Sequence, residues 1–339
     1  DGLLHLGHTV ALYTYLPSED KSEKLLLRGL LGVVRNIFSL RRDIRSADIV
    51  HALDIFPYGI LAWIASVGLK KPLVITAVGS GSIIPLYQWP WRSIGAFIIR
   101  HAATLVTISD FMRREILKQI PNIVITVIHP GIDRSWFGRS GQSVDSGGYR
   151  PYILTVGALR WRKGHKISIP AFARVKKDFP SLRYVIVGKR QNNIMYKRIF
   201  DLIREHDLEG SVHVLESVES AEELRSLYRG AELFLLISQN SGHDVEGFGM
   251  VFLEAASQGL PVIGSVGCGV EDAVANGKNG ILVNEKSIDE AADAISRVLR
   301  DTELKKRFSE ASRKFASGFL WEEKIAEYER LYQRITSRA

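Results

Sequence analysis

The sequence predicts an α/β protein with two doubly wound domains, each built around a parallel sheet. Short apolar segments alternate with amphipathic stretches along all 339 residues. This repeated strand-then-helix order is typical of parallel sheets that helices cover on both faces. The length suits two domains at about 100–200 residues each. A stretch rich in Gly and Ser, residues 138–150, separates the two halves and is typical of a linker.

In the first half, apolar runs predict strands and the amphipathic stretches between them predict helices. The expected strands are residues 9–14, 49–52, 73–77, 104–108 and 125–129. The expected helices are residues 25–45, 57–67, 91–101 and 110–120.

The second half repeats the pattern and ends in helices. The expected strands are residues 152–158, 183–187, 212–215, 233–237, 261–264 and 280–283, and the closing helices are 287–300, 303–315 and 321–335. Two such domains joined by a linker predict a cleft between them, at the carboxyl ends of the strands.

The composition is that of an ordinary globular chain, with 46% hydrophobic and 24% charged residues. It excludes disorder, collagen and coiled coil as descriptions of the whole chain. The single cysteine, Cys268, allows no disulfide within the chain and fits a reducing compartment. The most continuous apolar stretch, residues 58–69, is shorter than the roughly 18–20 residues that a membrane span needs. We therefore expect a cytoplasmic location.

The most informative stretch is residues 238–263, where Glu246-Gly-Phe-Gly lies between a strand and a helix that starts near Met250. Glycines before a helix let a ligand approach the backbone, and the helix N-terminus attracts a phosphate. A carboxylate such as Glu246 or Glu254 would repel that phosphate unless sugar or ribose hydroxyls occupy it. The alternative is an ordinary strand–loop–helix with both glutamates on the surface.

A second stretch, residues 152–165, gathers three cations after a strand that ends at Val156-Gly157. Arg160, Arg162 and Lys163 at the carboxyl end of a strand would neutralise a pyrophosphate leaving group. The alternative is a solvated loop with scattered charge.

A third stretch, residues 264–280, carries a Gly-rich turn around Cys268. Gly267 and Gly269 would again allow a close approach to the backbone. No partner base is evident by spacing, so we expect Cys268 to fill space and not to act as a nucleophile.

Taken together, these segments resemble the retaining glycosyltransferases of family 4, which have the GT-B fold. The pattern E-G-F-G-x-x-x-L-E-A begins at Glu246, and G-x-P-V-I follows at Gly259. The pattern V-G-x-L-x-x-x-K-G matches residues 156–164, I-x-x-G-I-D matches residues 128–133, and residues 108–113 match a helix opening of the family. The stretch around Glu246 is most similar to the phosphatidylinositol mannosyltransferase branch, which favours GDP-mannose as donor.

The resemblance implies roles for individual residues. Glu246 would hold the sugar hydroxyls and Lys163 the diphosphate, and Arg162 joins them as an expected catalytic residue. Glu254 would bind the ribose. The residues expected to bind the donor are Gly157, Arg160, Gly247, Phe248, Gly249, Met250, Val251 and Glu254. The resemblance implies no metal ion and no other cofactor. It also implies that no dedicated protein base is required, because the donor phosphate itself assists deprotonation of the acceptor.

The sequence departs from the family pattern in three ways. Many members carry Arg where this chain has Ala158, and we expect Arg160 or Arg162 to supply that charge. Many carry His where this chain has Val78, so no catalytic His is named. Residues 79–82 after Val78 are either an active-site loop or a simple turn. The opening strand and Gly-rich loop of the family are also missing, so we expect a first βα unit of roughly 25–30 residues upstream.

The resemblance also assigns the domains. Residues 1–137 would be the acceptor side, with 318–339 crossing back onto it, and residues 151–317 would bind the donor. The expected activity is retaining transfer of a sugar from GDP-mannose or a UDP-sugar to a hydroxyl of a glycan or lipid-linked acceptor. Two alternatives stay open: a non-catalytic nucleotide-sugar-binding protein of GT-B fold, and a sugar-nucleotide epimerase on that fold.

Positive charge is concentrated in the first half. The net charge is +8, and residues 1–150 hold 17 Lys and Arg against 11 Asp and Glu. If helical spacing is continued through the helix predicted at 25–45 and the residues just before it, one stripe would carry Lys21, Lys24, Arg28, Arg35 and Arg42. Such a stripe suits peripheral attachment to the anionic inner face of a membrane, and a solvated basic face is the alternative. No base-stacking module is visible, so nucleic acid is not an expected partner.

Overall fold

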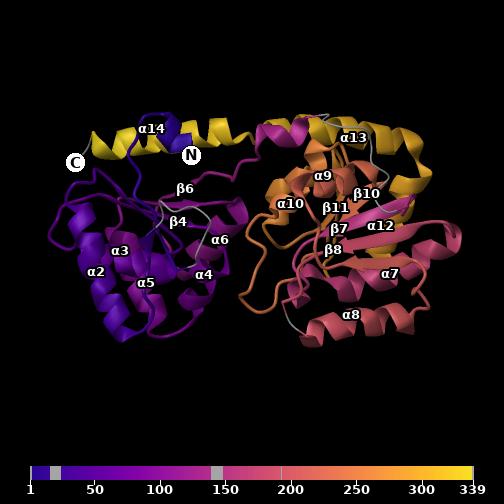
Figure 1. Ribbon diagram of the computed structural model, residues 1–339, viewed down its shortest axis with the longest axis horizontal. Helices are drawn as coiled ribbons and strands as arrows, with labels where there is room; N and C mark the ends of the chain where they lie inside the picture. Colours follow the sequence, from indigo (N-terminus) through magenta and orange to yellow (C-terminus); the bar gives the residue numbers. More distant parts are fainter. Residues whose placement is uncertain (1, 16–23, 139–147, 192, 338–339) are drawn as a thin grey trace. The chain divides into compact units, whose positions relative to one another are not determined.

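The computed structural model describes residues 2–15, 24–138, 148–191 and 193–337. The chain divides into two compact units, residues 1–129 with 321–339 and residues 130–320 (Figure 1). Each is an α/β unit with a parallel sheet, as the sequence predicts. Most of the predicted linker, residues 139–147, lies outside the described residues. Among the described helices, none is both long enough and apolar enough to cross a bilayer.

The first unit is built on a four-stranded parallel sheet. Its strands, in spatial order, are β3 (Val50–Leu53), β4 (Leu73–Ala77), β5 (Thr104–Thr107) and β6 (Ile125–Val127). All five residues of β4 are buried, as expected for a central strand covered on both faces. A separate parallel pair is formed by β1 (Tyr13–Thr14) and β2 (Lys24–Leu25), so β1 is shorter than the predicted strand 9–14.

Helices of different lengths surround this sheet. They are α1 (Gly2–His5), α2 (Leu30–Ile44), α3 (Ile60–Ser66), α4 (Ser80–Ile83), α5 (Trp91–His101), α6 (Asp110–Gln119) and α14 (Trp321–Thr336). A π-helical turn (Ile55–Gly59) precedes α3 and a 3₁₀ turn (Ile84–Tyr87) follows α4. The helix start predicted at Asp110 is confirmed, and the Ser109 hydroxyl caps it by accepting a hydrogen bond from the N–H of Met112.

Helix α2 begins later than predicted, at Leu30 instead of residue 25. Gly29 stands before it with φ 83°, a left-handed conformation that does not continue into a helix. The Asn36 side chain also holds the preceding backbone outside the helix. It accepts a hydrogen bond from the Leu27 N–H and donates one to the Leu27 carbonyl, each at 2.9 Å.

The predicted basic stripe along this helix is therefore wrong. Arg35 and Arg42 lie on α2, but Arg28 precedes the helix and Lys24 lies in strand β2. Lys21 falls outside the described residues. Only part of the positive charge of the first half is therefore carried by this helix.

Helix α14 packs on the first unit through an apolar cluster and a polar contact. Leu331 joins Val74 and Val106 of the sheet in one buried cluster. His51 of β3 lies between the two sides, with Nδ1 2.6 Å from the Tyr332 hydroxyl and Nε2 2.7 Å from the Thr76 hydroxyl. Burial lowers the pKa of His51 to about 4, so the ring is neutral in the folded protein at pH 7.

The second unit is built on a six-stranded parallel sheet. Its strands are β7 (Tyr152–Val156), β8 (Arg183–Val187), β9 (Val212–Leu215), β10 (Leu233–Leu235), β11 (Val262–Ser265) and β12 (Gly280–Val283). The spatial order is β12-β11-β10-β7-β8-β9, so the chain reverses direction across the sheet between β7 and β10. In open α/β sheets, ligands bind outside the carboxyl ends of the strands at such a reversal.

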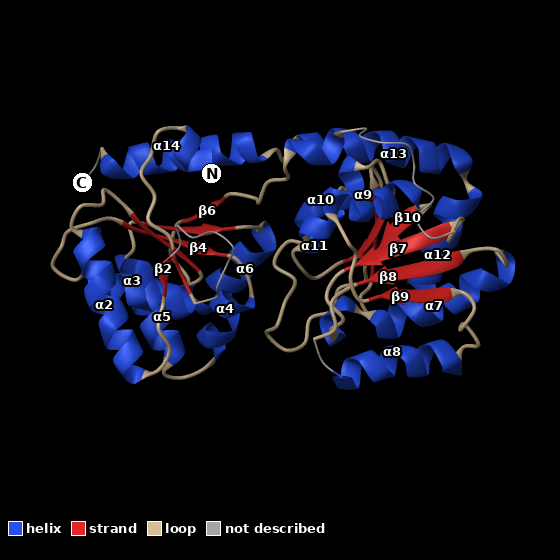
Figure 2. Cartoon of the chain, viewed as in Figure 1, coloured by secondary structure: helices blue, strands red, loops and turns tan. Residues whose placement is uncertain are grey.

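Helices lie on both sides of this sheet (Figure 2). They are α7 (His165–Asp178), α8 (Asn193–Glu205), α9 (Ala221–Gly230), α10 (Met250–Ser257), α11 (Val270–Ala273), α12 (Ile288–Arg300) and α13 (Thr302–Ser317). Two 3₁₀ turns, Arg134–Phe137 and Trp161–Lys163, complete the unit. Helices α9, α12 and α13 begin after an Ser or Asp side chain that accepts a backbone N–H, the usual helix cap.

The second unit includes residues 130–137, which the sequence assigned to the first domain, and it ends at Leu320 instead of residue 317. The Ile132 N–H donates to the Phe319 carbonyl at 2.7 Å, which joins the two ends of the unit. The Trp136 ring packs edge-on against Tyr228. These contacts explain why the boundary lies at Pro130.

We expect His51 to make the stability of the first unit depend on pH. Its folded pKa of about 4 is below the ordinary value, so its contribution is fully present above pH 6.5 and is lost as the pH falls toward 4. The loss should be on the order of 2–3 kcal/mol. Urea unfolding at a series of pH values should show a smaller acid-induced loss for His51→Gln than for wild type. His101→Gln, at an exposed position in the same unit, is the control, and an equal loss in both variants would contradict the prediction.

Candidate functional site

The loop after β7 is held against the end of β10 by close backbone packing. Gly164, which follows the turn Trp161–Lys163, has φ 65°. A Cβ atom at this position would lie 1.8 Å from the carbonyl oxygen of Ile237, so only glycine fits. The fold therefore places Arg162 and Lys163 beside the residues that follow β10.

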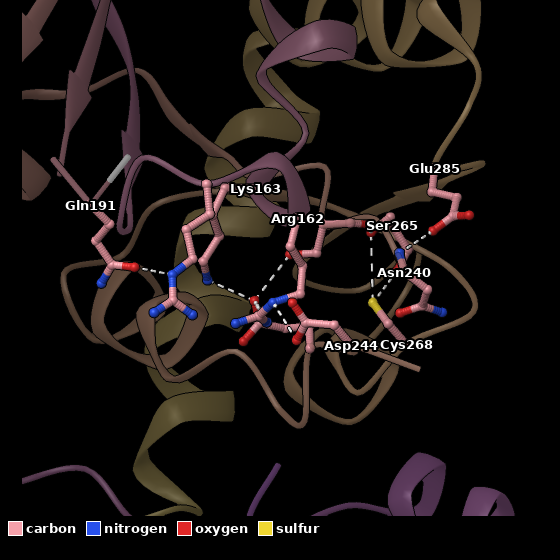
Figure 3. Close-up of polar contacts among 11 residues, drawn as sticks. Arg162, Lys163, Gln191, Asn240, Asp244, Ser265, Cys268 and Glu285 are labelled. Atoms are coloured by element: carbon pink, nitrogen blue, oxygen red, sulfur yellow. Dashed lines mark hydrogen bonds and ion pairs between the residues drawn. The ribbon is translucent and has the colours of Figure 1, made fainter. Parts of the chain in front are cut away.

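Glu246 is the centre of a largely buried ion cluster. Its Oε2 lies 2.6 Å from Lys163 Nζ and 2.9 Å from Arg162 Nη1, and the three side chains are only 11–14% exposed. The Ser238 hydroxyl donates to the same oxygen at 3.3 Å. Figure 3 shows Arg162 and Lys163 reaching toward the same point, with Asp244 beside them, 3.5 Å from Arg162 Nε.

This cluster keeps Glu246 charged. Burial alone would raise the pKa of Glu246, but the positive charges and hydrogen bonds of Lys163 and Arg162 outweigh burial and hold the pKa below its ordinary value. The described contacts of its carboxylate all go to Oε2. Glu246 can therefore accept hydrogen bonds from ligand hydroxyls at Oε1.

The loop after β11 supports the segment that follows Glu246. The Gly269 N–H donates to the Glu246 carbonyl at 2.8 Å, and a Cβ atom at Gly269 would lie 2.0 Å from the Gly247 carbonyl oxygen. Next to this contact, Cys268 is fully buried, and burial raises the pKa of its thiol to about 11. A thiol in this state fills space, as the sequence predicts, and is not a nucleophile at neutral pH.

Helix α10 begins at Met250, directly after Gly249, which has φ 91°. The Phe252 N–H donates to the Gly249 carbonyl at 2.9 Å, and the N–H groups that precede it in the first turn have no carbonyl to bond within the helix and can bind an anion. Phe248 is buried and its ring packs against Phe319, with centroids 5.9 Å apart. Phe248 could therefore meet a ligand only through its backbone, whereas the Val251 side chain is partly exposed.

Glu254 lies on α10, eight residues after Glu246. The Tyr228 hydroxyl donates to its Oε2 at 2.8 Å. Burial raises the pKa of Glu254, and the hydrogen bond from Tyr228 and the charge of Lys163 partly offset this effect. Lys163 thus acts on both carboxylates, although its ion pair is with Glu246.

Arg160 is separated from this cluster. It is exposed and its Nε donates to Gln191, which follows β8 and lies at one side of Figure 3. Gly157, which follows β7, packs against the Lys163 side chain. A Cβ atom at this position would lie 3.2 Å from Lys163 Cε. The structure thus brings Lys163 and Arg162, but not Arg160, to Glu246.

Sequence reasoning did not single out the polar residues that join the loops after β10, β11 and β12. The Asn240 N–H donates to the Glu285 carboxylate at 2.9 Å (Figure 3), and its side-chain amide donates to the Gly267 carbonyl at 2.7 Å. Ser238 and Asn240 lie three and five residues after the end of the buried strand β10, which is the signal that could have identified them. Tyr228 gave no such signal, because its contact depends on how α9 and α10 pack.

The first unit has its own polar loop at the carboxyl ends of β3 and β4. Asp54 Oδ1 accepts hydrogen bonds from the Val78 N–H at 3.1 Å and the Ser82 hydroxyl at 2.6 Å. Burial raises the pKa of Asp54 despite these hydrogen bonds. Asp54 also has φ 73°, which is rare for a residue other than glycine. The segment 79–82 is therefore held in a defined conformation, and Val78 beside it is exposed.

A Rossmann-like unit with cations and a helix N-terminus at its strand reversal is typical of nucleotide-binding proteins. Residues 142–315 match the family model described as Glycosyl transferases group 1, and residues 1–136 match the one described as Glycosyltransferase Family 4. The first match spans just over half of the sequence, and the chain therefore belongs to the glycosyl transferases group 1 family.

Solved structures with this fold confirm the GT-B prediction. A glycosyltransferase from Rickettsia africae aligns with a TM-score of 0.82 and 19% identity, over 99% of this chain and 93% of that one. The Anabaena protein HepE, in complex with UDP and glucose, aligns with a TM-score of 0.77 and 20% identity, over 91% of this chain and 83% of that one. At these identities the likeness concerns the fold.

Curated relatives include different glycosyltransferases. An uncharacterised glycosyltransferase of Methanocaldococcus jannaschii is 24% identical over 91% of this chain and 82% of its own length. Glycogen synthase of Mycobacterium tuberculosis is 28% identical over 81% of this chain and 66% of its own length. The GDP-mannose-dependent phosphatidylinositol monomannoside mannosyltransferase of that organism is also 28% identical, over 50% of this chain and 44% of its own length. Because glycogen synthase is as identical to this chain as the mannosyltransferase is, and over a longer stretch, sequence similarity does not single out the mannosyltransferase branch.

We expect the acceptor atom of Asp54, and not its charge, to hold the loop of the first unit. Asp54→Asn keeps Oδ1 and removes a buried charge, so its unfolding free energy should stay within about 0.5 kcal/mol of wild type or rise. Asp54→Ala leaves the Val78 N–H and the Ser82 hydroxyl without this acceptor and should lose about 1–3 kcal/mol. Chemical unfolding of the three proteins at pH 7 tests this. An equal loss in both variants would show that the carboxylate charge is required.

Proposed function

We propose that this chain is a retaining glycosyltransferase. It would move a sugar from a nucleoside-diphosphate sugar to a hydroxyl of a glycan or lipid-linked acceptor. The observation that carries the proposal is the cluster of Glu246 with Lys163 and Arg162 at the strand reversal of the second unit. It combines an ionised acceptor of sugar hydroxyls with two cations suited to a diphosphate.

In this proposal, Lys163 and Arg162 stabilise the charge that develops on the leaving diphosphate. An ammonium group has three N–H donors and a guanidinium has five, so their contacts with Glu246 leave donors for phosphate oxygens. The N-terminus of α10 adds further N–H groups. Groups fixed before the reaction lower its barrier because they need no reorganisation. We propose that these cations make a metal ion unnecessary.

The second carboxylate, Glu254, would accept hydrogen bonds from the ribose of the donor. GDP-mannose and UDP-sugars are both candidate donors. The name of one relative specifies GDP-mannose, and the Anabaena structure holds UDP and glucose. The resemblance around Glu246 favours GDP-mannose.

A second candidate is a non-catalytic protein of GT-B fold that binds a nucleotide sugar. The exposed side chain at Val78, where many family members carry His, favours this candidate. It shares the donor site with the first candidate and differs from it only in the absence of turnover.

Substitutions in the ion cluster test the proposed function. Lys163→Met and Glu246→Gln should each lower sugar transfer or donor hydrolysis by about 100-fold or more, because each removes a preorganised charge at the reacting sugar or diphosphate. The matched control is the more exposed pair of Lys305 with Glu232 in the same unit, where Lys305→Met and Glu232→Gln should change the rate less than about twofold.

The assay uses purified protein with GDP-mannose, UDP-sugars and ADP-sugars, and follows thermal stabilisation and release of the nucleoside diphosphate. Stabilisation by a donor without turnover would favour the non-catalytic candidate. No stabilisation by any of them would contradict both candidates.

We also propose that the first unit attaches to an anionic membrane surface through helix α2. Leu31 is 87% exposed and Phe38 is 70% exposed, with Val34 between them at helical spacing. The exposed side chains of Arg35 and Arg42 lie on the same helix. Solvent-exposed apolar residues flanked by arginines are typical of a helix that lies in a lipid interface. Because Lys24 and Arg28 lie outside α2, the proposed membrane surface consists of Leu31, Val34, Arg35, Phe38 and Arg42.

Liposome sedimentation tests this surface. Wild type should bind vesicles that contain anionic lipid, and binding should fall as salt increases. Phe38→Glu and the double variant Arg35→Glu with Arg42→Glu should each weaken binding by about tenfold. The control is Ile194→Glu on α8 of the second unit, because Ile194 is 71% exposed. Binding that is insensitive to salt, or equal losses in Phe38→Glu and Ile194→Glu, would exclude α2 as the membrane surface.

A further inference from the structure

Tyr228 is a buried residue whose hydroxyl contacts Glu254 of the candidate site. It lies near the end of α9 with its side chain fully buried. Its hydroxyl donates to Glu254 Oε2 at 2.8 Å, across to helix α10. Its ring packs against the rings of Trp136 and Phe234, with centroids 5.8 Å away in each case. The ring has little freedom to move, so the position of the hydroxyl is set by packing.

The contact matters because Glu254 is a carboxylate with little other support. Burial disfavours its charged form, and the Tyr228 hydrogen bond is the largest effect that opposes burial. The charge of Lys163, whose ion pair is with Glu246, adds a smaller effect. A carboxylate that receives one fixed hydrogen bond at Oε2 keeps one rotamer and has Oε1 left for a ligand.

We propose that Tyr228 is a positioning residue for nucleotide recognition: its hydroxyl orients Glu254 so that the carboxylate binds the ribose hydroxyls of the donor. The proposal rests on the proposed function, because it assumes that Glu254 faces the ribose. It predicts that Tyr228 affects selection for a ribose over a deoxyribose without itself touching the ligand. A residue that only packs the core would lower stability without changing this selection.

The test is calorimetric titration with UDP and GDP and with their 2′-deoxy and 3′-deoxy forms. Wild type should bind the ribose form of its preferred diphosphate about tenfold more tightly than at least one deoxy form. Tyr228→Phe should bind the ribose form about five- to tenfold more weakly and discriminate less than about twofold. The control is Tyr184→Phe, which removes another fully buried hydroxyl of this unit, bonded to Thr155, and should keep the selection.

Two further measurements separate positioning from packing. In a Glu254→Ala background, Tyr228→Phe should change affinity less than about twofold, because the residue through which it acts is gone. In Tyr228→Phe alone, the pKa of Glu254 rises further. The remaining preference for ribose should then be lost at a higher pH on acidification than in wild type. Circular dichroism confirms that each variant is folded.

The outcomes distinguish the two proposals. Binding of neither UDP nor GDP by wild type would overturn the proposed function and this inference with it. Binding that is lost in Lys163→Met but shows no preference for ribose in wild type would support the donor site and overturn the inference. Full ribose selection in Tyr228→Phe, or an equal effect of that substitution with and without Glu254, would also overturn it.

Discussion

The ion cluster of Glu246 with Lys163 and Arg162 is the interaction on which the organisation of the second unit depends. It joins the loop after β7 to the loop after β10, the two strands between which the order of the sheet reverses. Charges removed from water are costly unless they are paired, so each loop needs the other to complete the cluster. The lack of a side chain at Gly164 lets the two loops come together. A charged group is thereby fixed at the edge of the sheet before any ligand arrives.

The sequence predicted several strands to the residue: β4, β8, β9 and β12 have the predicted bounds. β4 is buried at all five residues, and a continuous apolar run of this kind leaves little choice of conformation. β9 and β12 lie at the two edges of their sheet and are only partly buried. The start of α2 was missed because it depends on the conformation of Gly29 and on the contacts that Asn36 makes nine residues away from Leu27. An amphipathic pattern alone continues through such a break.

The sequence predicted which residues form the candidate site better than it predicted which of them contact one another. The motifs located Lys163 and Glu246, but their pairing spans 83 residues and depends on the neighbouring positions of β7 and β10. Arg160 and Arg162 look equivalent in the sequence. In the structure, Arg160 donates to Gln191, whereas Arg162 pairs with Glu246. The contact of Tyr228 with Glu254 could not be predicted at all, because helices α9 and α10 must first pack before the two side chains meet.

Three buried ionisable groups, His51, Asp54 and Glu246, are held in different ways. In the first unit, His51 and Asp54 are bound by hydroxyl groups, and Asp54 also by a backbone N–H, whereas in the second unit Glu246 is paired with opposite charges. Burial lowers the pKa of His51 and raises that of Asp54, and so favours the neutral form of each group. In contrast, the cations beside Glu246 lower its pKa and keep it ionised. Acid should weaken both units through buried histidines, because burial lowers the pKa of His51 and of His165 in the second unit to about 4.

The burial of Cys268 has a practical consequence. It is the sole thiol of the chain, fully buried beside the contact between Gly269 and Glu246, and its raised pKa leaves very little thiolate at neutral pH. A thiol reagent can therefore modify the folded protein only when this part of the second unit opens. The rate of modification then reports the local opening of the candidate site without any added label, and a ligand that closes the loops would slow it.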